Sequence, residues 1–198
     1  PSFFEFLFLM ALIIFQEIKP DCCIIETGMG GRYDATNLLD PEISVITSIS
    51  MDHMEFLGNT LKEIAFHKAG IIKPGKRVLS CGQEEEVMQV IRDEAGKKQA
   101  LLEVVSEDNL NFNEKPGKYI DFLNSNAYDR KRVAGDFQKE NISLAIRAAQ
   151  LLSGSLSDEK IVNGLRHLVL PGRMEEVLPR VFVDVAHNMQ GIEAFCRT

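Results

Sequence analysis

The chain has 198 residues, of which 45% are hydrophobic and 26% charged, so its composition is that of a folded globular protein and excludes a disordered or collagen-like chain. Its 22 basic and 29 acidic residues give a net charge of −7, so we expect neither nucleic acid nor a membrane among its partners. The length allows one full domain, or most of one domain and a piece of another.

The most apolar stretch of the sequence, residues 6–15, lies near its beginning. Ten apolar residues are fewer than the ~20 that a bilayer-spanning helix needs, and no basic leader or cleavage site accompanies them. Ser2 followed by Glu5 predicts a capping box, and Pro20 predicts the end of the helix. We therefore expect a buried helix rather than a membrane segment.

Residues 22–26 form an apolar run that leads into the glycine-rich sequence 27–32 and predicts a buried strand followed by a turn. Adjacent residues on a strand point to opposite faces, so we expect Cys22 and Cys23 to be packed in the interior, with a redox or metal pair as the alternative. The four cysteines include no CxxC pair, which indicates reduced thiols and a cytoplasmic protein.

The following elements alternate between strands and helices. A second buried strand is expected over 44–49 and leads to Asp52 and His53. A helix from about Leu61 to Gly70 has a second capping box, formed by Thr60 and Glu63. The pattern then predicts a strand over 77–81, a charged amphipathic helix over 84–97, a strand over 101–105, and loops with a hairpin over 106–133.

The last third of the sequence predicts two helices and one strand. The helices are expected over 136–154 and from Ser157 to about Leu168, and a break follows at 170–173. The strand, over 181–185, leads to His187. This alternation predicts an α/β fold with a mostly parallel sheet flanked by helices, followed by the start of a second α/β domain.

Ligands of open α/β sheets bind outside the carboxyl ends of the strands, and three predicted strands end at Glu26, His53 and Asp184. Each feature there also has a structural interpretation. The glycine-rich sequence serves either a tight turn or a bound phosphate or cation, and His53 is either a structural side chain or a metal ligand. Lys68, at the end of its helix, is by itself typical of a surface lysine that faces the helix dipole.

Residues 70–77 match the first seven positions of a phosphate-binding P-loop, but the eighth is Arg77 where Ser or Thr is required. Pro74 removes one backbone N–H, and the segment follows a helix and enters a strand, which is the reverse of a P-loop. We therefore expect an ordinary turn here.

Six motifs in order resemble folylpolyglutamate synthase and its bifunctional form with dihydrofolate synthase, which belong to the Mur ligase superfamily. They cover residues 26–37, 45–53, 68–75, 138–141, 170–175 and 184–188. The resemblance implies an ATP-dependent reaction in which a folate or dihydropteroate carboxylate is phosphorylated and the amino group of L-glutamate attacks the acyl phosphate. It also implies Mg²⁺ as the metal.

The resemblance also implies roles for particular residues. Glu26 and His53 would be Mg²⁺ ligands, with His53 also catalytic. Lys68 would be the lysine that this family carbamylates, catalytic and able to hold a second metal ion. The residues that would contact ATP are Asn141, Arg173, Asp184 and His187. Val185 departs from the family motif, which usually has glycine after the aspartate.

In the family a P-loop lies upstream of the first helix, and most of the C-terminal domain lies beyond the last strand found here. We therefore expect residues 1–170 to be part of the central ATP-binding domain and 171–198 to be the hinge and first strand of the C-terminal domain. Such a fragment would be inactive alone. The alternatives are another Mur-type amide ligase and a non-catalytic nucleotide-binding module derived from one.

Overall fold

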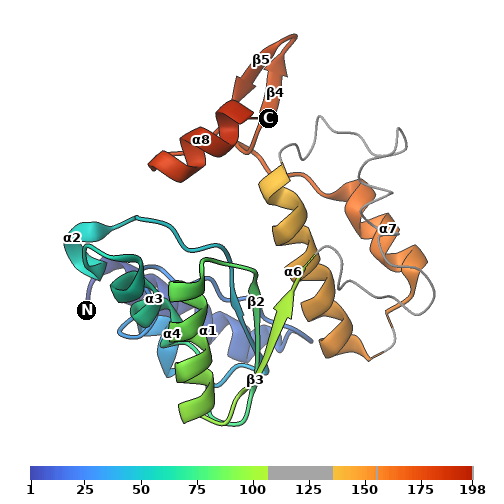
Figure 1. Cartoon of the computed structure of the whole chain (residues 1–198). Helices are drawn as coiled ribbons and strands as arrows, with labels where there is room; N and C mark the ends of the chain where they lie inside the picture. Colours follow the sequence, from blue (N-terminus) through green and yellow to red (C-terminus); the bar gives the residue numbers. More distant parts are fainter. Residues whose placement is uncertain (107–135, 155, 198) are drawn as a thin grey trace.

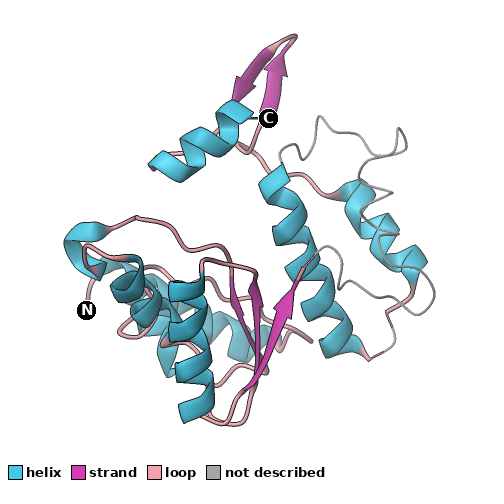
Figure 2. Ribbon diagram, viewed as in Figure 1, coloured by secondary structure: helices cyan, strands magenta, loops and turns pink. Residues whose placement is uncertain are grey.

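The computed structural model describes residues 1–106, 136–154 and 156–197, which Figure 1 colours along the sequence. The predicted hairpin within 106–133 lies almost entirely outside these ranges. The centre of the fold is a parallel sheet of three strands in the order β1-β2-β3, which Figure 2 draws in magenta. Their bounds are β1 (Ile43–Ile46), β2 (Arg77–Cys81) and β3 (Leu101–Val105).

The sheet is wound as two consecutive strand-helix-strand crossovers. Ile43 is paired with Arg77 at the start of β2, and Arg77 is paired in turn with Leu101 at the start of β3. The crossovers contain α3 (Leu61–Ala69) and α4 (Glu85–Lys97), which pack on each other and on one face of the sheet. The predicted α/β class with a parallel sheet is therefore confirmed.

A second layer of helices covers the other face of the sheet. Leu144 on α6 (Asp136–Ser153) packs with Leu79, Cys81 and Val105 of the strands. The opposite side of α6 buries Ile142 and Ile146 against α7 (Asp158–His167). Because β2 alternates between two buried faces, all its side chains except that of Arg77 are buried.

Local capping explains where the helices begin. The side chains of Ser2 and Glu5 cap α1 (Phe3–Ile18) reciprocally, and Thr60 and Glu63 do the same for α3. Ser157 accepts a hydrogen bond from the Lys160 N–H at the start of α7. These predicted helix starts are confirmed.

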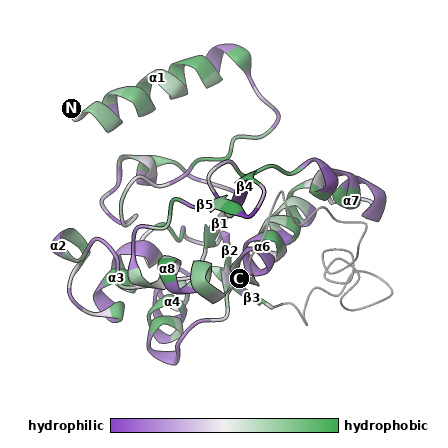
Figure 3. Cartoon of the chain, turned by 90° about the horizontal axis from the view of Figure 1, so that it is seen from above, coloured by the Kyte–Doolittle hydropathy of each residue, from purple (hydrophilic) through white to green (hydrophobic). Residues whose placement is uncertain are grey.

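The prediction that the first helix is buried is wrong for the described chain. Figure 3 shows α1 set apart from the body and coloured mostly as hydrophobic, and Phe8 is its single buried residue. Its main packing partner in the described ranges is the short 3-10 helix η1 (Ala35–Leu38). Helix propensity and capping depend only on neighbouring residues, and they are enough to form α1. Burial of its apolar side chains also requires another part of the chain to pack against it. None of the helices in the described ranges has the length and apolarity needed to span a bilayer.

The strand predicted over 22–26 is also not formed. This segment has no strand partner among the described residues, and Cys22, Cys23 and Glu26 are exposed, as is Ile24, at 94%. An apolar run becomes a strand only when a neighbouring strand pairs with its N–H and C=O groups. The expectation that Cys22 and Cys23 pack in the interior is therefore wrong for this structure.

The last part of the chain, residues 174–197, forms a small separate unit, which we call the C-terminal unit. The antiparallel strands β4 (Glu175–Leu178) and β5 (Val181–Val183) are followed by α8 (Met189–Arg197). The strand predicted over 181–185 is confirmed in shortened form, while β4 and α8 were not predicted. In Figure 1 this unit lies on the side of the sheet toward which the parallel strands point, so it faces their carboxyl ends.

Candidate functional site

The chain beyond β1 carries the predicted polar residues to the carboxyl edge of the sheet. Past Ile46 the strand ladder ends, and the side chain of Gln83 takes over the pairing. Its Oε1 accepts the Ile49 N–H at 2.7 Å, and its Nε2 donates to the Thr47 carbonyl at 3.3 Å and to the Ser80 hydroxyl at 3.0 Å. Gln83 thus fixes the course of the segment that delivers Asp52 and His53.

His53 has a left-handed backbone, with φ 50°, at the start of the single-turn helix α2 (Met54–Leu57). Histidine adopts this conformation more readily than most residues other than glycine. Its imidazole makes no capping hydrogen bond and is exposed, with Nε2 4.0 Å from Asp52 Oδ1. The ring is therefore available to a ligand.

Asp52 is the residue around which the site is organised. Its Oδ1 accepts the His53 N–H at 2.8 Å, and its Oδ2 accepts from Asn188 Nδ2 at 2.9 Å and lies 3.8 Å from His187 Nε2. Burial alone would raise the pKa of Asp52, but these hydrogen bonds and the two nearby imidazoles outweigh burial and lower it. The carboxylate is thus charged at neutral pH.

Lys68 lies in the last turn of α3, where its side chain is half-buried. Burial lowers the pKa of its amine, and the charge of Asp52 opposes this effect in part. Among the described residues Lys68 makes no ion pair within 4 Å. A desolvated amine without a bound carboxylate is more reactive as a nucleophile than an ordinary surface lysine.

Glu26 and His53 are both exposed and can each offer one donor. Among the described residues, no three His, Cys, Asp or Glu side chains are grouped so that they could hold a metal ion. Mg²⁺ usually takes only one or two protein carboxylates and completes its shell with water and phosphate oxygens. Glu26 offers a carboxylate and His53 a ring nitrogen, no contact between these two side chains is present in the described ranges, and a carboxylate made from Lys68 would add a further oxygen donor.

Three of the other predicted residues lie in or beside the C-terminal unit. Both oxygens of Asp184 accept backbone N–H groups, from Met174 at 2.8 Å and from Ala186 at 2.7 Å. Arg173 is exposed in the turn before β4 and makes no ion pair within the described ranges. His187 is exposed, and its Nδ1 lies 3.0 Å from the Val185 carbonyl.

The structure therefore brings together only part of the predicted set. Asp52 accepts the His53 N–H, lies within 4.0 Å of one ring nitrogen of His53 and of His187, and acts electrostatically on Lys68. Asn141 lies on α6, where its amide donates to Gln138 Oε1 at 3.2 Å. Sequence reasoning missed Asp52 itself as a functional residue, although its place after the strand and beside His53 was a usable signal.

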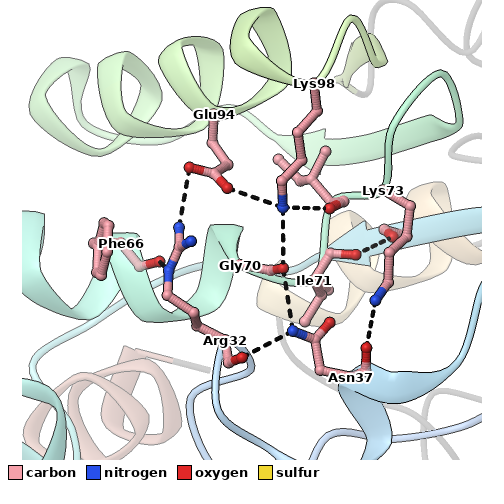
Figure 4. Close-up of polar contacts among 10 residues, drawn as sticks. Arg32, Asn37, Phe66, Gly70, Ile71, Lys73, Glu94 and Lys98 are labelled. Atoms are coloured by element: carbon pink, nitrogen blue, oxygen red, sulfur yellow. Dashed lines mark hydrogen bonds and ion pairs between the residues drawn. The ribbon is translucent and has the colours of Figure 1, made fainter.

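The glycine-rich loop is held to α3 and α4 through Arg32 (Figure 4). The guanidinium lies 3.0 Å from Glu94 Oε2, donates from Nε to the Phe66 carbonyl at 3.1 Å, and stacks 3.8 Å above the Phe66 ring. Glu94 also contacts Lys98 at 2.9 Å. This network fixes the loop against the helix that carries Lys68.

A second set of contacts in Figure 4 closes the end of α3. Asn37 Nδ2 donates to the carbonyls of Arg32 at 2.9 Å and Gly70 at 3.4 Å, and Lys73 Nζ donates to the Asn37 carbonyl. Lys73 belongs to the segment that resembles a P-loop. Because this segment leaves α3 and enters β2, and its lysine serves the adjoining loop, the prediction of an ordinary turn is confirmed.

Close packing explains the glycine at position 31. Its φ is +142°, and a Cβ there would lie 2.7 Å from Ile71 Cγ2 and 3.1 Å from the His67 carbonyl oxygen. Only glycine allows the loop to approach the last turn of α3 this closely. The structural role predicted for this loop is thus present, whatever else the loop binds.

Comparison with known proteins gives consistent results. The family model described as the Mur ligase middle domain matches residues 9–149. A Bacillus subtilis dihydrofolate synthase/folylpolyglutamate synthase is 39% identical over all of this chain and 49% of its own length. An FPGS-AMPPCP-folate complex has a TM-score of 0.82 and 27% identity, covering 98% of this chain and 50% of that one.

A third comparison is with E. coli FolC in complex with ADP, at a TM-score of 0.81 and 31% identity, covering 98% of this chain and 47% of that one. The chain thus spans about half the length of the relatives that it matches.

Proposed function

The chain belongs to the Mur ligase family, in its folylpolyglutamate synthase/dihydrofolate synthase branch, and we propose that it carries the strand-end site of an ATP-dependent ligase. The ligase adds L-glutamate to a carboxylate of folate or dihydropteroate. ATP phosphorylates that carboxylate, and the glutamate amino group then attacks the acyl phosphate and releases phosphate. Such a reaction needs positioning and charge neutralisation more than covalent help from the protein.

The observation that carries this proposal is the setting of Lys68 in the fold of this family. The Lys68 side chain is half-buried, burial lowers the pKa of its amine although the charge of Asp52 opposes this, and the lowered pKa increases the fraction of neutral amine. A neutral amine adds CO₂ and loses one proton to give a carbamate, which converts a cation into a carboxylate. With Glu26 and His53, the Lys68 carbamate would then hold Mg²⁺, which when bound neutralises phosphate charge.

We assign contacts with ATP to Asn141, Arg173, Asp184 and His187. Relatives of known structure bind AMPPCP or ADP, which supports a nucleotide at this edge of the sheet. Arg173 offers an exposed guanidinium to phosphate oxygens. Asp184 accepts two backbone N–H groups and so holds the loop in place. Its remaining lone pairs can accept hydrogen bonds from ribose hydroxyls.

We place the boundary between the two domains at the turn after Leu170, with residues 1–170 in the central ATP-binding domain and 171–198 in the hinge and the start of the C-terminal domain. Val185 lies at this hinge, where its N–H donates to the Gly172 carbonyl at 2.9 Å. The 198 residues contain no phosphate-binding loop, so the chain alone is expected not to turn over ATP.

The test is a chimera in which this chain replaces the matching half of the Bacillus subtilis relative. Mass spectrometry should detect a product one glutamate residue heavier than folate or dihydropteroate, formed only with ATP and Mg²⁺. A muramyl peptide supplied as acceptor tests for another Mur-type ligase. A folded chimera that binds Mg-ATP by calorimetry but glutamylates no acceptor would instead support a non-catalytic nucleotide-binding module.

A further inference from the structure

We propose that Asn188 is a positioning residue that, through Asp52, holds the C-terminal unit (residues 174–197) against the segment between β1 and α2. The contact joins side chains 136 residues apart in the sequence, with Asn188 Nδ2 donating to Asp52 Oδ2 at 2.9 Å. We call it the Asp52–Asn188 latch. Its effect is to set where Asp184 and His187 lie over the carboxyl edge of the sheet.

Both ends of the Asn188 amide are used, which fixes its orientation. Oδ1 accepts the Gly191 N–H at 2.8 Å and so caps the first turn of α8, while Nδ2 points to Asp52. A rotation of the amide by 180° would lose both hydrogen bonds. The cap of α8 and the contact with Asp52 are therefore made by one side chain.

Asp52 is equally well fixed on its side. Its Oδ1 accepts the N–H of the next residue at 2.8 Å, which leaves Oδ2 directed at the C-terminal unit. The segment before it is held by Gln83 at the Ile49 N–H. These hydrogen bonds already order the Asp52 carboxylate before it meets Asn188, so little entropy is lost when the contact forms.

Hydrogen bonds within the C-terminal unit hold its parts together, so the unit moves as one body when Asn188 contacts Asp52. Asp184 accepts from the N–H groups of Met174 at 2.8 Å and Ala186 at 2.7 Å, which ties the start of β4 to the end of β5. Val185 is tied to Gly172 at the hinge. When Asn188 meets Asp52, it therefore brings Asp184 and His187 with it, and His187 Nε2 comes to 3.8 Å from Asp52 Oδ2. The benefit to catalysis rests on the proposed function, but the latch itself does not.

The latch can be tested by a distance measurement between spin labels on the 198-residue chain, without nucleotide or substrate. One label is attached to the exposed Cys196 on α8, and the other to Glu86→Cys on the exposed side of α4, in a background with Cys22→Ser and Cys23→Ser. Cys81 is buried, and its pKa is raised to about 11, so it stays unlabelled. The latch predicts a single narrow distance distribution.

The informative variant is Asn188→Ser, because serine also caps helices but is too short to reach Asp52. A hydrogen bond to a charged group that is partly exposed contributes on the order of a tenfold preference, so the ratio of closed to open molecules should fall about tenfold and the distribution should broaden. Asn188→Asp should broaden it further, because two carboxylates would then face each other.

The exchange Asp52→Asn with Asn188→Asp keeps a carboxylate and an amide in contact and retains a capping acceptor for α8. It should restore the narrow distribution. The proposal is overturned if the unaltered chain already shows a broad distribution, if Asn188→Ser leaves it narrow, or if the exchanged pair is as broad as Asn188→Ser. Since the readout involves no ligase chemistry, its failure is distinguishable from failure of the proposed function.

Discussion

Replacement of Arg32 by methionine tests how the glycine-rich loop is held to the helix that carries Lys68. Methionine keeps an apolar stem of similar length but removes three interactions of the guanidinium. These are the contact with Glu94 at 3.0 Å, the hydrogen bond to the Phe66 carbonyl at 3.1 Å and the stacking on the Phe66 ring at 3.8 Å.

The expected loss can be summed from these contacts. The hydrogen bond to Phe66 contributes about 1 kcal/mol and the stacking about 0.5–1 kcal/mol. Removing one partner of a buried ion pair costs about 3–5 kcal/mol when the other charge is left alone. Glu94 would still be paired with Lys98 at 2.9 Å, so we assign about 1 kcal/mol to the loss of the Arg32–Glu94 contact. The total of about 2.5–3 kcal/mol corresponds to a fall in Tm of about 5–10 °C for a chain of this size.

The loss should also depend on pH in a defined direction. Burial by itself raises the pKa of Glu94, but Arg32 and Lys98 outweigh burial and lower it below the usual value of a glutamate. A carboxyl whose folded-state pKa is lowered stabilises the fold above its unfolded pKa and loses that contribution as the pH falls through the folded value. The effect of Arg32→Met should therefore be largest above about pH 5 and shrink as the pH falls below about 4.

The assay is urea unfolding followed by circular dichroism, at pH 7 and at pH 3.5. A double-mutant cycle with Glu94→Gln separates the ionic part from the other two interactions. A coupling energy near zero in that cycle, together with a loss that does not change with pH, would refute this account of the loop.

Three further predictions concern the packing at two glycines, the reactivity of the cysteines and the amine of Lys68. Gly31→Ala should destabilise the fold by about 2 kcal/mol in urea unfolding, because its Cβ would meet Ile71 and His67. Gly96→Ala on α4 has open space around it and should stabilise the fold by about 0.5–1 kcal/mol. Equal effects of the two substitutions would contradict the packing argument. Titration of the native chain with a thiol reagent should modify Cys22, Cys23 and Cys196 quickly and Cys81 only after unfolding, and fast modification of all four would contradict the buried position of Cys81. In ¹³C-bicarbonate at pH 8, NMR should show a carbamate signal that Lys68→Met removes and Lys62→Met retains; a signal that survives Lys68→Met belongs to another amine.

What could be predicted from the sequence was mainly local. The capping boxes at Ser2 and Thr60 each involve residues three apart, and they gave the helix starts correctly. The strands over 77–81 and 101–105 were found because both are short, mostly apolar runs; the central strand β2 is buried on both faces beyond Arg77, whereas β3 at the edge of the sheet is only partly buried. In both cases the signal and the structure involve the same few residues.

What could not be predicted depends on partners distant in the sequence. The run over 22–26 has the same apolar character as the true strands, but no described strand pairs with it. The burial of α1 likewise depends on what packs against it. The contacts of Asp52 with Asn188 and of Ile49 with Gln83 join residues 136 and 34 positions apart, and nothing local marks either pair.

The role proposed for Lys68 in the chemistry of a folate-glutamate ligase can be measured as amide formation by the chimera with the Bacillus subtilis relative. Lys68→Met is compared with Lys62→Met, an exposed lysine on the same helix. We expect Lys68→Met to lower the rate of glutamate addition by at least about a hundredfold and Lys62→Met to leave it within about twofold. Equal rates for the two folded variants would contradict the assignment of Lys68 to the active site.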